Sequence, residues 1–531
     1  MIPKLPFFAR DRIHSATSRF SYDPYTLFLH DGGCEDYKDH KDPDQSLSDP
    51  GRLFHGSFAH HAAKVHELTH WIQTTSTSIG ALLSLVRYVQ QRTAEHMLHA
   101  MRPSVRHRVL DRRIIHGQPL LPSGPDGIDI MSAGRELSVD PVHLQMWLDC
   151  LAVDKLLYST ETPIPDRQFP SNTVLGEILG DCFLYLAGEL SLGTYPGHET
   201  ARGLFRAAKG PGAVQTADGE HLTTENIIEC GATINELLTG CNFGSFIELA
   251  GISVDRRQCL RTLLETSYGR AARWLLKMTK APADRLTELL PALSVICDLS
   301  LNPPVPPHYL SFHRVLDWDE IYPPYRFVRL TRACPRVGLL GMGAAHETAV
   351  EFSRRLCDAA GIEHPLDYPA ELQNWGGGVD LRHELQDRWD FRGGANGWYK
   401  VVLSTNQRMW ELRQSSWPFC SNFGECTFGN NSSKYITLLF NDLDPAHWFA
   451  HPYLYAMQDA SCKISGAINK KNGEHLGISV AYSHFLYDFM IGEGGFDFSC
   501  LPAKMHPHVH SLPTAFRDVW ANATNHDAAL G

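Results

Sequence analysis

The sequence predicts an α+β protein that is mainly helical, with a helical core followed by a C-terminal mixed α/β region. Two observations support this fold class. Between about residues 51 and 300, apolar side chains recur at helical spacing in several long stretches. After Pro365, Gly, Trp, Asn and Phe become more frequent, and strand-like runs appear at residues 399–403 and 434–440.

Four segments succeed one another in this prediction. Proline restricts the backbone and interrupts helices, so the Pro-rich run 302–310 separates the helical core from the C-terminal part of the chain. The segments are an irregular polar arm (1–50), the helical core (51–300), a Pro-bounded connection with one helix (301–370) and the C-terminal α+β region (371–531). The clearest helices span 79–101, 141–157, 174–192, 224–238, 257–278 and 341–360.

Composition describes a folded globular chain and excludes several classes of partner. Of 531 residues, 43% are hydrophobic and 20% charged, as in folded rather than disordered proteins. A net charge of -11 argues against a nucleic-acid-binding face. The first residues lack the apolar region of a signal peptide, and no run of about 18 apolar residues occurs. We therefore expect no membrane partner.

Cysteine usage predicts a reducing compartment. The 13 Cys are scattered without a CxxC pair, and Cys150, Cys182 and Cys297 lie inside apolar helical runs. Buried reduced thiols in a cytoplasmic protein fit this pattern. Cys420 and Cys426 flank a short polar run, which we interpret as a loop with free thiols.

Residues 66–70 read His-Glu-Leu-Thr-His, an H-E-x-x-H pentapeptide within a stretch free of Pro and Gly from residue 58 to 73. Two imidazoles four residues apart lie on one face of a helix, near enough to hold one metal ion. The intervening Glu67 can take a proton from a metal-activated water. A chain with 28 His yields about 0.07 such motifs by chance, so the context of the motif decides its meaning.

The context favours a metal site over a coincidence. Apolar residues at helical spacing form one stripe, and His66 and His70 fall on a second face. Small side chains on that second face would let another helix approach closely. The alternative is a solvated His/Glu face, or core histidines satisfied by hydrogen bonds. The stripe consists of Phe58, Val65, Leu68 and Ile72, and the small residues are Ala59, Ala62 and Ala63.

The motif resembles the active-site helix of the zincin metallopeptidases. The longer string VHELTHWIQTTSTSIG (65–80) is similar to bacterial zincin-like proteins in which an aromatic residue, Gln and a Thr/Ser-rich turn follow H-E-x-x-H. The resemblance implies a zinc hydrolase and covers only a small part of the chain. Gln73 and Ser76 stand where the metzincin extension needs Gly and His. A distant Glu, as in gluzincins, is therefore the expected third ligand.

We expect that ligand to be Glu229, in the predicted helix 224–238. Glu225, Glu229 and Glu236 project from one face, and Ala232 between them leaves room beside Glu229. Thr223 or Thr224 is the expected N-cap. The segment looks like the E-x-x-A ligand helix of gluzincin-like groups, although Cys230 replaces a usual Gly. An opposed apolar face leaves open an ordinary amphipathic helix with its glutamates in water.

The alternative third ligand is Glu177, in the predicted helix 174–192. Glu177 and Asp181 have the E-x-x-x-D spacing seen in other gluzincins, where Glu binds the metal and Asp steadies a ligand His. They fall among apolar residues, where a carboxylate needs a partner.

Other His-containing patterns predict no chemistry. The pairs His346-Glu347 and His383-Glu384 lack a second His, and we interpret them as surface or capping residues. Histidines also crowd the start of the motif helix, and we expect their side chains to be solvated. These are His55, His60 and His61.

The predicted function is zinc-dependent hydrolysis of a protein or peptide substrate. His66, His70 and Glu229 would bind Zn²⁺, and Glu67 would be the catalytic base. A Tyr, His or Arg from a distant segment is expected to stabilise the oxyanion. Two alternatives are a non-catalytic metal-stabilised binding or scaffold protein, and a helical-bundle Fe or Mn oxidoreductase with Glu177 or Glu229 as a ligand. A merely structural site has no need of Glu67, which favours hydrolysis.

Overall fold

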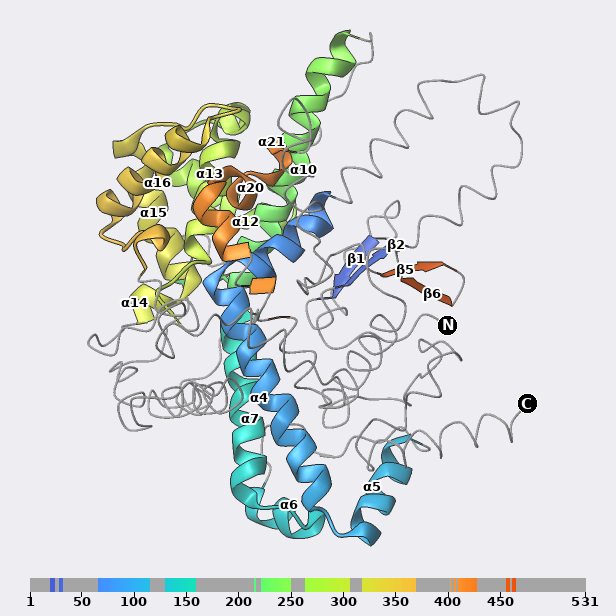
Figure 1. Cartoon of the computed structure of the whole chain (residues 1–531). Coiled ribbons are helices and arrows are strands. Elements are labelled where there is room, and N and C mark those ends of the chain that lie inside the picture. The colour runs from blue at the N-terminus through green and yellow to red at the C-terminus, as the bar shows by residue number, and fades with distance from the viewer. Residues whose placement is uncertain are drawn as a thin grey trace, which may run out of the picture.

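Helices dominate the part of the chain that the structure, a computed structural model, describes (Figure 1). The mainly helical character predicted from the sequence is therefore confirmed. No described helix is long and apolar enough to cross a lipid bilayer. The described residues are 20–23, 28–31, 65–114, 129–158, 214–215, 221–249, 263–305, 318–368, 402, 405–406, 409–426, 455–458 and 461–464.

The α-helices are α4 (Ser78–Ala100), α5 (Pro103–Ile114), α6 (Ile130–Leu137), α7 (Pro141–Tyr158), α10 (Thr224–Leu249), α12 (Arg270–Thr279), α13 (Leu286–Ser300), α14 (Trp318–Ile321), α15 (Pro323–Val337), α16 (His346–Ala360), α20 (Trp417–Ser421) and α21 (Phe423–Cys426). Residues 65–76, here called the motif helix, and residues 409–415 are also helical. The short 3-10 helices are η2 (Ser267–Gly269), η3 (Ala283–Arg285) and η4 (Pro365–Asp367). The strands are β1 (Phe20–Asp23), β2 (Phe28–Asp31), β3 (Val214–Gln215), β4 (His221–Leu222), β5 (Tyr455–Gln458) and β6 (Ser461–Ile464).

Three of the predicted core helices are present as α4, α7 and α10. The cap of α10 explains where it starts, because the Thr223 hydroxyl accepts a hydrogen bond from the Asn226 amide and the Asn226 side chain accepts one from the Thr223 amide. This reciprocal pair satisfies two backbone donors that the first helical turn cannot use. Helix α10 then continues beyond the predicted end, to Leu249. The predicted helix 174–192 lies outside the described residues.

Two other predicted helices differ from the structure at local breaks. The predicted helix 257–278 is interrupted at Thr266 and by η2 before α12 begins, and the Thr266 hydroxyl donates a hydrogen bond to the Leu263 carbonyl at this break. The predicted helix 341–360 begins only at His346. Gly343 has a φ of 66°, a left-handed conformation that an α-helix does not contain.

The motif helix and α4 are separate helices that meet at a break around Thr77. The Thr77 hydroxyl caps α4 by accepting a hydrogen bond from the Gly80 amide at 3.1 Å. A Cβ at position 80 would collide with the backbone carbonyl of Thr74, so the close turn requires glycine. The Ser78 amide bonds the Asn302 side chain at 3.1 Å. The Ser78 contact fixes the start of α4, next to the end of the motif helix, against the residues that follow α13.

One hydrophobic core joins helices from distant parts of the described chain. Helices α10, α12, α13, α15 and α16 contribute buried apolar side chains, and Trp417 of α20 joins them. Helices α4 and α7 pack as an antiparallel pair that extends away from this core, with α5 and α6 at the far end (Figure 1). Side chains from three of the predicted segments therefore share a single core.

The described strands form three antiparallel pairs of two strands each: β1–β2, β3–β4 and β5–β6. Strand β2 lies beside β5, so an N-terminal and a C-terminal hairpin are neighbours (Figure 1).

The predicted strand 399–403 is wrong at its one described residue, because Val402 is helical. Val402, Thr405, Asn406 and Met409 are all buried. The predicted strand 434–440 lies outside the described residues.

The described cysteines are mostly core residues. Cys150 and Cys297 are buried and form no disulfide, as expected, whereas Cys182 lies outside the described residues. Cys420 is also buried and free, but it belongs to helix α20, and Cys426 ends α21. The loop expected between them is therefore wrong. Pro418 at the start of α20 favours the first turn of a helix, which explains the difference.

His364 is buried beneath α16 in a network that requires a neutral ring. Its Nδ1 accepts a hydrogen bond from the Leu366 amide at 3.2 Å, and its Nε2 lies 2.8 Å from the Ser353 hydroxyl. The ring stacks on Trp417 with centroids 5.1 Å apart. Burial, together with the positive charge of Arg354, lowers the pKa of His364 to about 4.

This lowered pKa predicts a loss of stability in mild acid. Between pH 6.5 and 4 the unfolded chain binds a proton that the folded chain does not, so the free energy of unfolding should fall by about 3 kcal/mol over that interval. The measurement is urea unfolding at several pH values, compared with His364→Gln. The variant should lose this part of the pH dependence, whereas His99→Gln at an exposed position should keep it. Equal slopes in all three proteins would contradict the assignment.

Candidate metal centre

The motif helix presents His66 and His70 on one face and buries another. Val65, Leu68 and Ile72, the described residues of the predicted apolar stripe, are at most 8% exposed. The two histidines, by contrast, are only partly buried. Their Nε2 atoms lie 3.2 Å apart. The i,i+4 spacing has therefore placed two nitrogen atoms at one point in space.

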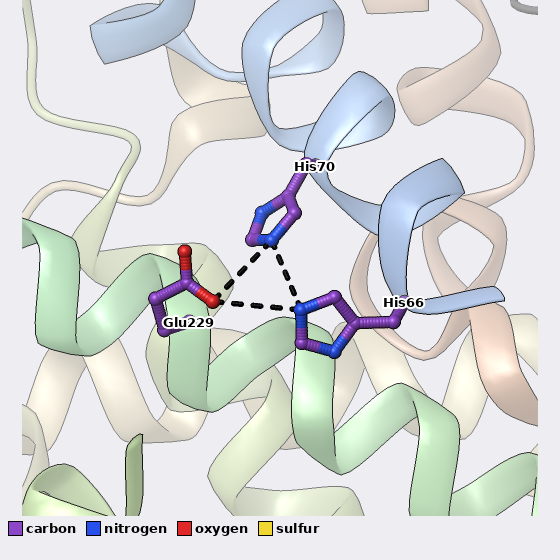
Figure 2. Close-up of side chains that lie close together, drawn as sticks. All are labelled: His66, His70 and Glu229. Atoms are coloured by element: carbon purple, nitrogen blue, oxygen red, sulfur yellow. Dashed lines mark hydrogen bonds and ion pairs between the residues drawn. The ribbon is translucent and has the colours of Figure 1, made fainter. Parts of the chain in front are cut away.

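Glu229 of α10 completes a group of three. Its Oε2 atom lies 3.4 Å from Nε2 of His66 and 3.5 Å from Nε2 of His70 (Figure 2). The three side chains are 17%, 12% and 20% exposed, so they are shielded but not sealed from solvent. The apolar residues on the other side of α10 face the core, and the motif helix covers the side that carries Glu229.

The spacing of the three atoms fits a small divalent cation. Ligand atoms around a tetrahedral zinc ion, at about 2.0–2.2 Å from it, lie about 3.3–3.6 Å from each other. The observed separations of 3.2, 3.4 and 3.5 Å match that range to about 0.1 Å. Two imidazole nitrogens and one carboxylate oxygen are also a donor set that zinc prefers. Within the described residues, this is the group of His, Cys, Asp and Glu side chains that could hold a metal.

The electrostatics of the group favour positive charge at its centre. Burial lowers the pKa of His66, but the nearby carboxylates of Glu229 and Glu236 outweigh burial and hold the pKa well above its ordinary value. The pKa of His70 is raised in the same way, mainly by the charge of Glu229 opposing burial. Burial raises the pKa of Glu229, yet the two imidazoles hold it well below its ordinary range. Protons on the imidazoles or a bound cation can supply this charge.

The outer nitrogen of each imidazole has its own partner. Nδ1 of His66 lies 3.3 Å from Oε2 of Glu236, two turns after Glu229 on α10. Nδ1 of His70 lies 3.0 Å from Oε1 of Gln73. Such partners orient a ligand histidine and leave its other nitrogen to face the metal. Gln73 thus orients the His70 ring by a hydrogen bond, whereas Nδ1 of His66 lies within ion-pair distance of Glu236 without forming a hydrogen bond to it.

Two further side chains adjoin the group. Glu67 is partly buried, and its charge acts on both histidines, so it lies near them. It is not one of the three side chains whose atoms converge on the centre. Tyr268 of η2 approaches His66 edge-on, with ring centroids 6.4 Å apart. A carboxylate and a phenol therefore lie near the two histidines.

Of the other candidate residues, the structure describes only His346 and Glu347, and it places them away from this group. Glu177 and the histidines at 55, 60, 61 and 383 lie outside the described residues. His346 begins α16, and its Nδ1 accepts a hydrogen bond from the Trp417 amide at 3.0 Å. Its neighbour Glu347 is exposed. The His346-Glu347 pair is therefore a helix-end contact, as interpreted from the sequence.

No family model, characterised protein or solved structure matches the chain. The resemblance to zincins thus rests on the motif residues.

The sequence did not indicate roles for Gln73, Glu236 and Tyr268. Gln73 shares the face of His70 at i+3, and Glu236 shares the face of Glu229 at i+7, so helical spacing could have indicated both. Nothing in the sequence links Tyr268 to a helix about two hundred residues earlier.

Proposed function

We propose that this protein is a zinc-dependent hydrolase, and that its substrate is a protein or peptide. One observation carries the proposal: Nε2 of His66, Nε2 of His70 and Oε2 of Glu229 converge with separations of 3.2, 3.4 and 3.5 Å, and Glu67 lies beside them. Three protein ligands leave a fourth tetrahedral position open, which is typical of catalytic rather than structural zinc sites.

The residues around the centre fit the roles that hydrolysis needs. A bound zinc ion would polarise the scissile carbonyl and make water more acidic. Glu67 would accept a proton from the attacking water as the carbon–oxygen bond forms. Glu67 would then deliver that proton to the leaving nitrogen as the carbon–nitrogen bond breaks. Tyr268 is the candidate donor for the negative charge that develops on the carbonyl oxygen.

Substitution of the ligands should remove the metal. Purified wild-type protein is expected to hold one equivalent of zinc, and His66→Ala, His70→Ala and Glu229→Ala should each fall below about 0.2 equivalents, since losing one of three ligands weakens a site severely. The measurement is elemental analysis after dialysis against a weak chelator. Glu177→Ala should keep the metal.

A matched control is available on α4. His99→Ala removes an exposed imidazole in the last turn of that helix and should leave the zinc content unchanged. If the His66 and His70 variants both retain a full equivalent, the metal lies elsewhere. If Glu229→Ala retains it and Glu177→Ala loses it, Glu177 is the third ligand and the hydrolase proposal stands.

Two alternatives receive less support. A purely structural site would hold α10 to the motif helix while the C-terminal mixed α/β region recognises a partner, but such a site needs no Glu67. An Fe or Mn oxidoreductase would need more carboxylate ligands. Glu236 lies against Nδ1 of His66 and not toward the shared centre, which disfavours it as such a ligand. The buried cysteines among the described residues that form no disulfide fit a reducing compartment, and we propose the cytoplasm.

A further inference from the structure

We infer that Gln73 is a positioning residue, which fixes the tautomer of His70 and ties the motif helix to α10. This inference rests on the proposed metal site. The Gln73 side chain makes two contacts: Oε1 lies 3.0 Å from Nδ1 of His70, and Nε2 donates a hydrogen bond to the backbone carbonyl of Ile228 at 2.9 Å. Ile228 directly precedes Glu229, so one amide contacts one ligand and the neighbour of another.

The Ile228 carbonyl determines which way the amide points. A carbonyl oxygen can only accept, so the NH₂ group of Gln73 must face it. The amide oxygen then faces Nδ1 of His70 and must accept a hydrogen bond from it. Nδ1 therefore carries the hydrogen, and Nε2 keeps a lone pair directed at Nε2 of His66 and Oε2 of Glu229. A backbone atom of α10 thus selects the ligating nitrogen on the motif helix.

Gly231 supports this arrangement from the α10 side. A Cβ at position 231 would lie 2.7 Å from Nε2 of Gln73, closer than the two atoms can approach. Glycine is unfavourable inside a helix, so its presence here has a packing reason. Gly231→Ala is consequently a second way to displace the Gln73 amide, and it changes no residue of the metal-binding trio.

Zinc affinity tests the inference directly. Gln73→Met removes both hydrogen bonds and should weaken zinc binding about 10- to 100-fold, the usual cost of losing an orienting partner. Gln73→Glu keeps an acceptor beside Nδ1 and should restore most of the affinity. Gly231→Ala should weaken binding in the same direction, and adding Gln73→Met to it should cost little more, because both changes break the same contact. Gln414→Met, at an exposed position, is the matched control.

A spectroscopic measurement separates positioning from general stability. Cobalt-substituted protein reports the ligand geometry through its visible absorption, which a loss of stability elsewhere would not move. We expect a changed spectrum for Gln73→Met and Gly231→Ala, and the wild-type spectrum for Gln414→Met. Wild-type affinity and spectrum in folded Gln73→Met would overturn the inference and leave the hydrolase proposal intact. A wild-type protein that binds neither zinc nor cobalt would overturn both.

Discussion

Glu67→Gln is expected to keep the zinc and to lose hydrolytic turnover by roughly 10²- to 10⁴-fold, the range for removing a positioned general base. The reason is geometric. Glu67 follows His66 directly, so it turns away from the direction in which the two imidazoles converge, yet its charge still reaches both of them. Gln has the same shape and cannot accept the proton of water. The measurement is initial rates on quenched fluorescent peptides, with zinc content determined on the same samples.

The control for this prediction is Glu347→Gln, which removes an exposed carboxylate at the start of α16. It should change neither turnover nor zinc content. Wild-type turnover in metal-loaded Glu67→Gln would exclude Glu67 as the base. Loss of the metal from that variant would mean that Glu67 is itself a ligand.

The parts of the site that depend on helical spacing were predictable. His66 and His70 are four residues apart, and the converging Nε2 atoms are a direct result of that spacing. Glu229 could be named because its helix has a capped start and a small residue at Ala232, which is fully buried. The sequence could not decide whether another element would cover the glutamate face of α10. The motif helix does so, and its identity is a property of the tertiary fold.

The parts that depend on distant contacts were not predictable. Gln73 is recognisable as a positioning residue only because Ile228, 155 residues away, lies against it. The run around Val402 has strand-like composition, yet Val402 itself is helical and buried. Tertiary packing overrides weak local preferences in this way, and a single sequence does not reveal which residues will pack together.

Arg413 shows the same dependence on distant partners and carries the largest expected effect on stability. Its guanidinium group is fully buried and bonds both carboxylate oxygens of Asp298, at 2.6 and 2.8 Å. Nε donates to the Ser76 carbonyl at 2.9 Å, at the end of the motif helix. The group also lies over the Trp417 ring, 5.0 Å from its centroid. One side chain therefore joins the motif helix, α13 and α20.

Arg413→Met should lower the free energy of unfolding by about 3–5 kcal/mol, because it leaves the buried Asp298 carboxylate without a counter-charge. The measurement is the urea midpoint at pH 7, at constant zinc concentration since a bound ligand shifts apparent stability. The exposed pair Arg285–Glu288 supplies the control, and Arg285→Met should change the midpoint little because solvent screens that pair.

The double variant Arg413→Met/Asp298→Leu distinguishes a lost counter-charge from lost packing. Replacing both members of a buried ion pair by apolar groups is often close to neutral, so the double variant should recover much of the stability lost by Arg413→Met. The zinc affinity, which Arg413→Met should also lower, should not recover in the double variant. The Ser76 carbonyl would still lack its partner. The motif helix, which bears His66 and His70, would therefore remain less firmly held at its C-terminal end. A double variant as unstable as the single one would assign the role of Arg413 to packing against Trp417 and Ser76.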